Sequence, residues 1–290
     1  MPPAADTPLD PRQDATIHPS AIVSSDATIE PGVTVGPRCT IEGPVTLRAG
    51  VTLIGDVHIT GDTEIGAGTM VYPYACIGFG PQHIKIKPGD PVGGVRIGAD
   101  CTIREHATIH AAMHEGAHTV LGDRDYIMVA GHIGHDCVLG DDVIVCNSAQ
   151  VAGHCEIADK VYISGNVSVH QFVRIGRGAM LSGGTQTGLD IPPYAVLAGR
   201  NVLAGLNLVG MRRAGIPREE ITRARAAYRG AFRRGVTRAE QLAQLDEHAE
   251  SSEVAKMMAD FVRASSRGIA SARPRPRHAA DIPGDDDGLA

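Results

Sequence analysis

Residues 121–157 read LGDRDYIMVAGHIGHDCVLGDDVIVCNSAQVAGHCEI, with an aliphatic residue at every sixth position and small or polar residues between them. The same spacing runs, with two interruptions, from Ile17 to Leu181. Neither an α-helix, with about 3.6 residues per turn, nor a simple alternating strand produces this period. A hexapeptide β-solenoid does, because each short strand points one aliphatic side chain inward and small residues form the corners. The sequence therefore predicts an all-β parallel solenoid over residues 16–194.

Two excursions interrupt this spacing. Residues 78–96 shift its phase by two and carry His83 and Lys85, whereas residues 110–119 leave the phase intact. An insertion in a solenoid projects from one corner and often lies on the binding face. A tolerated surface insertion is the alternative interpretation.

The segment after the solenoid has the signals of a small α-helical domain over residues 195–268. Pro192 and Pro193 close the hexads, and one helical segment is expected to end near Gly215. Residues 1–15 and 269–290 have the composition of a disordered lead and tail. The expected helix starts are Asn201, Pro217, Thr237 (with Glu240 in a capping box) and Ser251 or Ser252.

Composition and charge exclude several classes of protein. The net charge is −6, with 27 Lys and Arg against 33 Asp and Glu, so the chain as a whole is not expected to bind nucleic acid. No apolar run reaches the ~18 residues that a membrane span needs, and the N-terminal residues lack the pattern of a secretory signal. We therefore expect a cytoplasmic protein whose six cysteines are reduced.

The expected helical domain is locally basic. Between Met211 and Glu240 the chain carries nine arginines against three glutamates. Such a patch in an acidic protein indicates an anionic partner, such as a phosphate group or an acidic protein. A solvated helix face is the alternative.

Histidines gather in the middle of the hexads. The segment HIGHDC at 132–137 is followed one expected coil later by AGH at 152–154. If three hexads make one coil, Gly153 stacks on His135, one strand spacing away. An imidazole can take a proton from a hydroxyl, a carboxylate can orient the imidazole, and a glycine N–H can stabilise an oxyanion. The pattern therefore predicts general-base attack on an acyl group.

A metal site is the alternative chemistry for these histidines. His110, His132, His135 and His154 could supply imidazole ligands to zinc, as in hexapeptide-repeat carbonic anhydrases, or the chain could be a purely structural solenoid. The zinc interpretation has no support from a CxxC pair, and it leaves the arginine patch without a role. We therefore expect no metal.

The motifs and their order resemble one known family, the UDP-N-acetylglucosamine acyltransferases. The resemblance rests on the segments HIGHDC, AGH, VHQF (169–172) and DIPPY (190–194), and on the run Asn207…Gly210…Arg212-Arg213. It implies a left-handed parallel β-helix that assembles as a homotrimer, with active sites between subunits. It also implies transfer of a 3-hydroxyacyl chain from acyl carrier protein to the sugar 3-hydroxyl, the first step of lipid A synthesis. The only co-substrate chemistry implied is the thioester of the carrier protein, so no further cofactor is expected.

The resemblance also assigns roles to residues of this chain. His135 would be the general base, Asp136 its orienting carboxylate, and the Gly153 N–H the oxyanion donor. Gly183 matches the small residue that leaves room for a long acyl chain. The residues implied in substrate binding are His83, Lys85 (reaching a neighbouring subunit), His132, His154, His170, Gln171, Asn207 and Arg213. The residues expected to dock the carrier protein are Arg212, Arg218 and Arg223.

Departures from the family pattern concentrate on acceptor recognition. His83 stands where the family has an aspartate, Val209 where it has a glutamate, and Ala214 where it has a second arginine. The segment HAAM at 110–113 replaces the family's His-Arg-Gly-Thr, and the connection from Gly199 to Asn207 is one residue short. The same chemistry on a different nucleotide sugar, or on an amino sugar, is therefore the alternative function.

Overall fold

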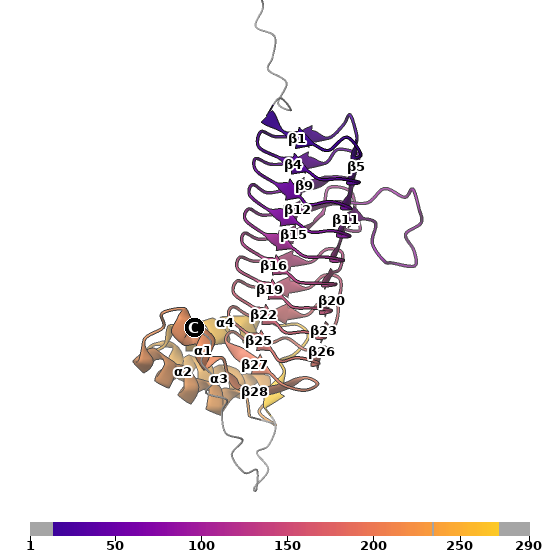
Figure 1. Ribbon diagram of the computed structural model, residues 1–290. Coiled ribbons are helices and arrows are strands. Elements are labelled where there is room, and N and C mark those ends of the chain that lie inside the picture. Colours follow the sequence, from indigo (N-terminus) through magenta and orange to yellow (C-terminus); the bar gives the residue numbers. More distant parts are fainter. Residues whose placement is uncertain (1–13, 234, 273–290) are drawn as a thin grey trace, which may run out of the picture.

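The computed structural model describes residues 14–233 and 235–272, and most of them form a parallel β-helix (Figure 1). Three successive strands make one coil, because each strand pairs in parallel with the third strand after it. Tyr126 of β16 (Tyr126–Ile127), for example, pairs with Ile144 of β19 (Ile144–Val145), which lies three hexads later in the sequence. The predicted parallel solenoid, with three hexads to a coil, is confirmed.

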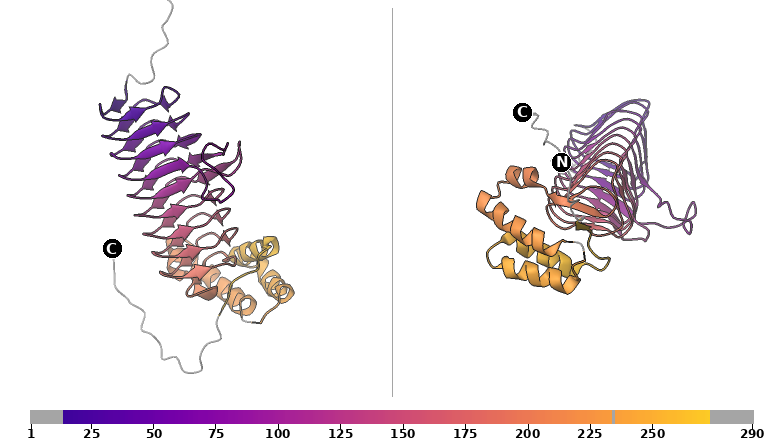
Figure 2. Two further views of the ribbon diagram at one scale, coloured as in Figure 1. Left: turned by 90° about the vertical axis from the view of Figure 1, so that its right-hand side faces the viewer. Right: turned by 90° about the horizontal axis from the view of Figure 1, so that it is seen from below.

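The coils stack into three sheets, A, B and C, that form the walls of the solenoid (Figure 2). Every pairing among the described strands is parallel except that of β27 with β28, which is antiparallel. Besides β16 and β19, sheet A contains β1 (Thr16–Ile17), β4 (Thr34–Val35), β7 (Thr52–Leu53), β10 (Met70–Val71), β13 (Thr102–Ile103), β22 (Tyr162–Ile163), β25 (Met180–Leu181), β27 (Ala195–Leu197), β28 (Val202–Leu206) and β29 (Ser271–Ala272). Sheet B contains β2 (Ile22–Val23), β5 (Thr40–Glu42), β8 (His58–Thr60), β11 (Cys76–Phe79), β14 (Thr108–His110), β17 (His132–Ile133), β20 (Gln150–Val151), β23 (Ser168–Val169) and β26 (Gln186–Thr187). Sheet C contains β3 (Thr28–Ile29), β6 (Thr46–Leu47), β9 (Thr63–Ile65), β12 (Gly94–Ile97), β15 (His118–Leu121), β18 (Val138–Leu139), β21 (Glu156–Ile157) and β24 (Arg174–Ile175).

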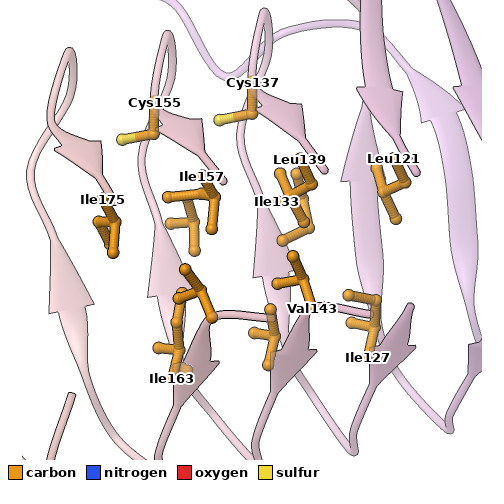
Figure 3. Packing of buried hydrophobic residues seen from close by; sticks show 14 of the residues in the cluster. Leu121, Ile127, Ile133, Cys137, Leu139, Val143, Cys155, Ile157, Ile163 and Ile175 are labelled. Atoms are coloured by element: carbon orange, nitrogen blue, oxygen red, sulfur yellow. The ribbon is translucent and has the colours of Figure 1, made fainter. Parts of the chain in front are cut away.

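The aliphatic residues at every sixth position form the core. Ile127, Ile133 and Leu139 point inward from the three walls of one coil and are at most 2% exposed (Figure 3). Each buried side chain of this size contributes about 1.5–3 kcal/mol relative to exposure. At the end of the described stack, Ile17 is 36% exposed.

The corners between walls bring residues one coil apart into columns. Corner residues such as Asp136 and Asp142 adopt a left-handed backbone, with φ of 58° and 59°. Asp and Asn tolerate this conformation. His154 (φ 60°) and Phe172 (φ 63°) also adopt it, in the column above Asp136. The same corner conformation is adopted elsewhere in the solenoid by other residue types, such as Arg38 and Lys160, so it is a property of the fold.

Two insertions interrupt the regular coils of the solenoid. Cys76 pairs with Thr108, well beyond the three hexads of a regular coil, so the first excursion is an insertion between β11 and β12. Its loop stands away from the solenoid (Figures 1 and 2). Thr108 pairs with His132, one hexad beyond a regular coil, so the second excursion adds a single hexad between β14 and β15.

Four helices follow the solenoid in the described part of the chain, as expected, but the first begins later than predicted. They are α1 (Leu208–Arg213), α2 (Arg218–Ala231), α3 (Arg238–Ala249) and α4 (Glu253–Ala264). The capping box of Thr237 and Glu240 at α3 and the Ser252 cap of α4 are both present. The expected cap at Asn201 is wrong: Asn207 caps α1, and residues 195–206 form β27 and β28 instead of helix.

Two further observations bear on the expected ends and on membrane insertion. Residues 271–272, placed by the sequence in the tail, pair with β28, while most of the expected lead and tail lie outside the described residues. None of the described helices combines the length and apolar character required to cross a bilayer. The six cysteines are all free thiols.

One carboxyl group lies inside the solenoid. Asp125 is 1% exposed at an inward corner position that the next coil fills with Val143. Its Oδ1 accepts a hydrogen bond from Val143 N at 2.8 Å, and its Oδ2 has no partner among the described residues. Burial raises the pKa of Asp125 to about 7.

We expect Asp125→Asn to raise the melting temperature above pH 7 and to flatten its dependence on pH. Between about pH 4 and pH 7 the unfolded chain has lost this proton while the folded chain keeps it, so wild-type stability falls as the pH rises through this window. The loss is of the order of a few kcal/mol. Asparagine stays neutral and retains an oxygen for Val143 N. Thermal melts from pH 5 to pH 8 test this, and parallel curves for the two proteins would contradict it.

Candidate active site

His135 lies at the corner between sheets B and C, directly after β17. Its Nδ1 is 2.7 Å from Asp136 Oδ2, and the two side chains are 12% and 15% exposed. Because an ionised carboxylate only accepts hydrogen bonds, Nδ1 carries the proton and Nε2 presents a lone pair. This is the arrangement of an oriented general base.

The second excursion holds the carboxylate of this pair. Met113 N donates to Asp136 Oδ2 at 3.1 Å, and Asp136 N donates to Thr119 Oγ1 at 2.8 Å. Residue Asp136 is thus fixed from both sides by residues 113–119. Sequence reasoning missed Met113 because it acts through its backbone, and it missed Thr119 because that residue resembles any other strand threonine.

The next coil brings Gly153 and His154 against His135. A Cβ built on Gly153 would lie 2.6 Å from His135 Cε1 and 2.7 Å from Nε2, so the backbone of Gly153 touches the imidazole ring. The Gly153 N–H donates to no backbone acceptor among the described residues. The N–H is therefore free to bind an oxyanion beside the general base.

His154 completes the column at this corner. Its ring packs edge-on against His135, with centroids 4.9 Å apart, and its Nε2 lies 3.8 Å from Asp136 Oδ2. On its other face Phe172 stacks in parallel at 4.5 Å. Phe172 was not among the predicted site residues, although its position one coil after His154 places it directly in the column.

Neutral imidazoles surround this column. Burial lowers the pKa of His154, against the opposing effect of Asp136, and burial followed by the nearby His135 lowers the pKa of His132. Burial and the neighbouring His132 and His135 lower the pKa of His110 to about 4. His132 Nδ1 also lies 2.8 Å from Thr108 Oγ1, which fixes its ring. The histidines flanking the site are thus hydrogen-bonding groups without positive charge at neutral pH.

The first excursion brings His83 to the same corner. Its ring lies edge-on to His135 with centroids 6.3 Å apart, and its Nδ1 accepts a hydrogen bond from Lys85 N at 3.3 Å. Lys85 itself is exposed on the projecting loop, next to Ile84, which is 99% exposed. The structure thus places His83 beside His135, whereas Lys85 is exposed at the surface of the chain.

His170 and Gln171 lie at the same corner, two coils above His135. His170 Nδ1 is 3.2 Å from Gln171 O and 3.4 Å from Arg267 Nη2. Arg267 is a residue that sequence reasoning missed, because it is distant in sequence and belongs to no recognised motif.

Three predicted residues lie elsewhere in the chain. Gly183 occupies a corner between sheets A and B, where an added Cβ would meet Gly165 O at an ordinary 3.5 Å. The fold does not require glycine there, which is consistent with space kept for a ligand. Asn207 caps α1 and donates to Gly178 O at 3.0 Å, and Arg213 ends the same helix. Asn207 thus lies at the corner between sheets C and A, whereas His135 lies at the corner between sheets B and C.

The arginines of the helical region border a concave surface between α1 and α2. The pocket that this surface encloses has a volume of about 670 Å³. Arg212, Arg218 and Arg225 line it, together with Leu208, Ile216 and Ile221. Arg223, one of the predicted docking residues, instead pairs with Glu220 at 3.2 Å. Arg225, two residues further along α2, lines this surface. The sequence alone does not show which of these two arginines faces it.

His135, Asp136 and His154 could in principle hold a metal ion, since one ligand atom from each lies within 4.8 Å of the others. Three protein ligands match the number used by catalytic zinc sites. However, Asp136 Oδ2 already accepts hydrogen bonds from His135 Nδ1 and Met113 N. The observed contacts are those of a paired acid–base group.

Comparisons with known proteins agree with this geometry. Residues 190–270 match the family described as Udp N-acetylglucosamine O-acyltransferase; Domain 2. The chain is 39% identical over 211 residues to an acyl-(acyl-carrier-protein)–UDP-N-acetylglucosamine O-acyltransferase of Rhizobium etli, covering 72% of this chain and 76% of that protein. The fold is similar to the UDP-N-acetylglucosamine acyltransferase of Francisella novicida, with a TM-score of 0.84, 33% identity and coverage of 90% and 95%. It is also similar to the Arabidopsis UDP-N-acetylglucosamine acyltransferase, with a TM-score of 0.77, 34% identity and coverage of 88% and 100%.

Proposed function

Because this chain belongs to the UDP-N-acetylglucosamine O-acyltransferase family, we propose that it transfers an acyl chain from acyl carrier protein to UDP-N-acetylglucosamine. It is an acyl-carrier-protein-dependent enzyme, and its reaction opens the synthesis of lipid A. The observation that carries the proposal is the oriented His135–Asp136 pair packed against the Gly153 backbone.

The geometry supports a single general-base mechanism. His135 Nε2 takes the proton of the sugar 3-hydroxyl as the oxygen attacks the thioester carbonyl carbon of a 3-hydroxyacyl donor. The carbonyl oxygen becomes an oxyanion that accepts a hydrogen bond from Gly153 N–H. Collapse of the intermediate breaks the carbon–sulfur bond, and the departing thiolate of the carrier protein takes the proton from His135. Asp136 stabilises the transient imidazolium and keeps its own charge throughout.

An assay against a panel of acceptors tests the substrate assignment. Purified protein is offered 3-hydroxyacyl carrier proteins of several chain lengths with UDP-N-acetylglucosamine and with other nucleotide sugars, including an amino-sugar nucleotide. Turnover on UDP-N-acetylglucosamine is expected to exceed that on the other acceptors. Preference for another sugar would assign the changes at His83, Val209 and Ala214 to a different acceptor.

The carrier protein is proposed to dock on the concave surface lined by Arg212, Arg218 and Arg225. A concentration of guanidinium groups attracts an acidic partner and raises its association rate. The chain is acidic overall, yet nine arginines against three glutamates lie between Met211 and Glu240. Arg223, which pairs with Glu220, has a smaller part in this role than the sequence suggested.

We expect the double change Arg212→Glu and Arg218→Glu to raise the KM for the acyl carrier protein about tenfold or more, with little change in kcat. Reversing two charges replaces attraction by repulsion and weakens the dependence of KM on salt. Arg229→Glu is the control, because Arg229 is exposed on α2, the helix of Arg218, but does not line the surface. Equal effects of the control and the double change would refute docking at this surface.

We further propose that the enzyme works as a homotrimer with each active site shared between chains. In one chain the His83–His135 group lies at the corner between sheets B and C, whereas Asn207 lies at the corner between sheets C and A, against Gly178. Because the two groups occupy different corners of one chain, we infer that different chains supply them to one substrate. The exposed Ile84 and Lys85 on the projecting loop are suited to contact with such a neighbour.

Mixing two inactive variants tests the shared site. We expect His135→Ala and Arg213→Ala proteins to be impaired separately, and activity to return when they are unfolded together and refolded as mixed trimers. A mixed trimer contains sites in which both intact residues face each other. Mixtures no more active than the separate variants, despite a trimeric mass by light scattering, would contradict a shared site.

A further inference from the structure

The segment that follows α4 lies along the last coils and is fixed on both sides of Arg267. Ser265 Oγ donates to Asp190 Oδ2 at 2.7 Å, and both residues are buried. Asp190 N donates to Gly268 O, and Ala270 N donates to Asp190 O, each at 3.0 Å. The backbone that carries Arg267 is therefore held in place by Asp190.

From this fixed position the half-buried Arg267 side chain reaches His170. Its Nε donates to Gly188 O at 3.2 Å, and its Nη2 lies 3.4 Å from His170 Nδ1. In the described part of the chain, Arg267 forms no ion pair with a carboxylate. Its contacts are a carbonyl oxygen and an imidazole nitrogen, an unusual choice for a guanidinium group, which ordinarily pairs with an anion.

The two contacts of His170 Nδ1 require opposite tautomers. A carbonyl oxygen only accepts, so a hydrogen bond to Gln171 O, 3.2 Å away, needs the proton on Nδ1. A guanidinium group only donates, so a hydrogen bond from Arg267 needs a lone pair on Nδ1 and places the proton on Nε2. A hydrogen bond from Arg267 therefore selects the tautomer with the proton on Nε2, and a hydrogen bond to Gln171 O selects the other.

We propose that Arg267 is a positioning residue for acyl transfer, which holds His170 in the tautomer that presents Nε2–H to the substrate. This inference rests on the proposed function, in which His170 lines the substrate cleft. Without the arginine, the ring is free to donate Nδ1–H to Gln171 O, and Nε2 then offers a lone pair where the substrate otherwise meets a donor. The helical region is thereby coupled to the cleft through one side chain.

A double-mutant cycle tests this role, with kcat and KM measured for both substrates. We expect Arg267→Ala to lower kcat/KM about tenfold, and to change the same kinetic parameter in the same direction as His170→Ala. The double variant is expected to be no worse than His170→Ala alone, because both changes remove one interaction. Arg267→Lys, which keeps the charge but reaches only one acceptor, is expected to restore part of the loss.

Two control variants separate positioning from structural support. Arg263→Ala removes a surface arginine of α4 that pairs with Asp246 and Asp260, and we expect it to retain activity. Ser265→Ala removes the buried hydrogen bond to Asp190, so it reports how activity responds when the segment is loosened. We expect it to lower the melting temperature more than Arg267→Ala does.

Three outcomes would overturn the inference. Multiplicative effects of Arg267→Ala and His170→Ala would show that they act independently, and would leave the proposed function standing. A fall in melting temperature with Arg267→Ala as large as that with Ser265→Ala would assign the arginine a structural role. Full activity of His170→Ala would show that His170 has no role in binding the substrate. That result would overturn both the assignment of His170 to the cleft in the proposed function and the inference.

Discussion

His135→Ala is expected to lower kcat by roughly 10³- to 10⁴-fold while the melting temperature stays within a few degrees of wild type. The imidazole is the only group of the described site whose lone pair is oriented by a carboxylate, through the 2.7 Å contact of Nδ1 with Asp136. Its side chain lies at a corner and outside the aliphatic core, so its removal leaves the stacked coils intact. Single-turnover measurement of acyl transfer would give the chemical step directly.

Two further variants sharpen this prediction. Asp136→Asn is expected to reduce kcat to a value between those of wild type and His135→Ala, because the amide can present an N–H to Nδ1 and so favour the wrong tautomer. His18→Ala is the matched control, since His18 is exposed near the first described coil, with its Nδ1 2.9 Å from Ser20 Oγ. Retained activity in His135→Ala would refute the assignment of His135 as general base, whatever the activities of Asp136→Asn and the control variant.

The sequence predicted the solenoid because its fold is a local repeat. One inward residue per six, exemplified by Ile133, determines both the period of the strands and the register of the coils. The coil of three hexads then places Gly153 next to His135, and the structure confirms that contact. Few folds allow two residues so far apart in the sequence to be paired from counting alone.

Other features depend on contacts that no local pattern records. Asn201 has the character of a helix cap, but residues 202–206 pair antiparallel with β27, and this pairing moves the start of α1 to Asn207. The support of Asp136 by Met113 N comes from the backbone, which carries no sequence signal. The pairing of Arg223 with Glu220, three residues earlier, and its place off the concave surface likewise depend on the packed helices.

The absence of a side chain at position 153 is as much a part of the site as the imidazole it faces. Gly153 has no left-handed backbone angle that would call for glycine, and alanine could adopt its conformation. What excludes a methyl group is His135: the added carbon would lie 2.6 Å from Cε1, 2.7 Å from Nε2 and 3.0 Å from Nδ1. The ring cannot yield easily, because Asp136 holds it through Nδ1.

Gly153→Ala is therefore expected to lower kcat about 10²- to 10³-fold by displacing the imidazole and crowding the oxyanion position. The fold should survive, since the main cost is local and alanine also restricts the unfolded chain. Gly205→Ala is the control, because a Cβ there meets no atom within 4 Å, and we expect it to retain full activity. A Gly153→Ala enzyme with wild-type kcat would show that the imidazole moves freely during the reaction. In that case the close packing of His135 against the next coil would have no part in catalysis, whereas the N–H at position 153, which alanine keeps, would retain its proposed role.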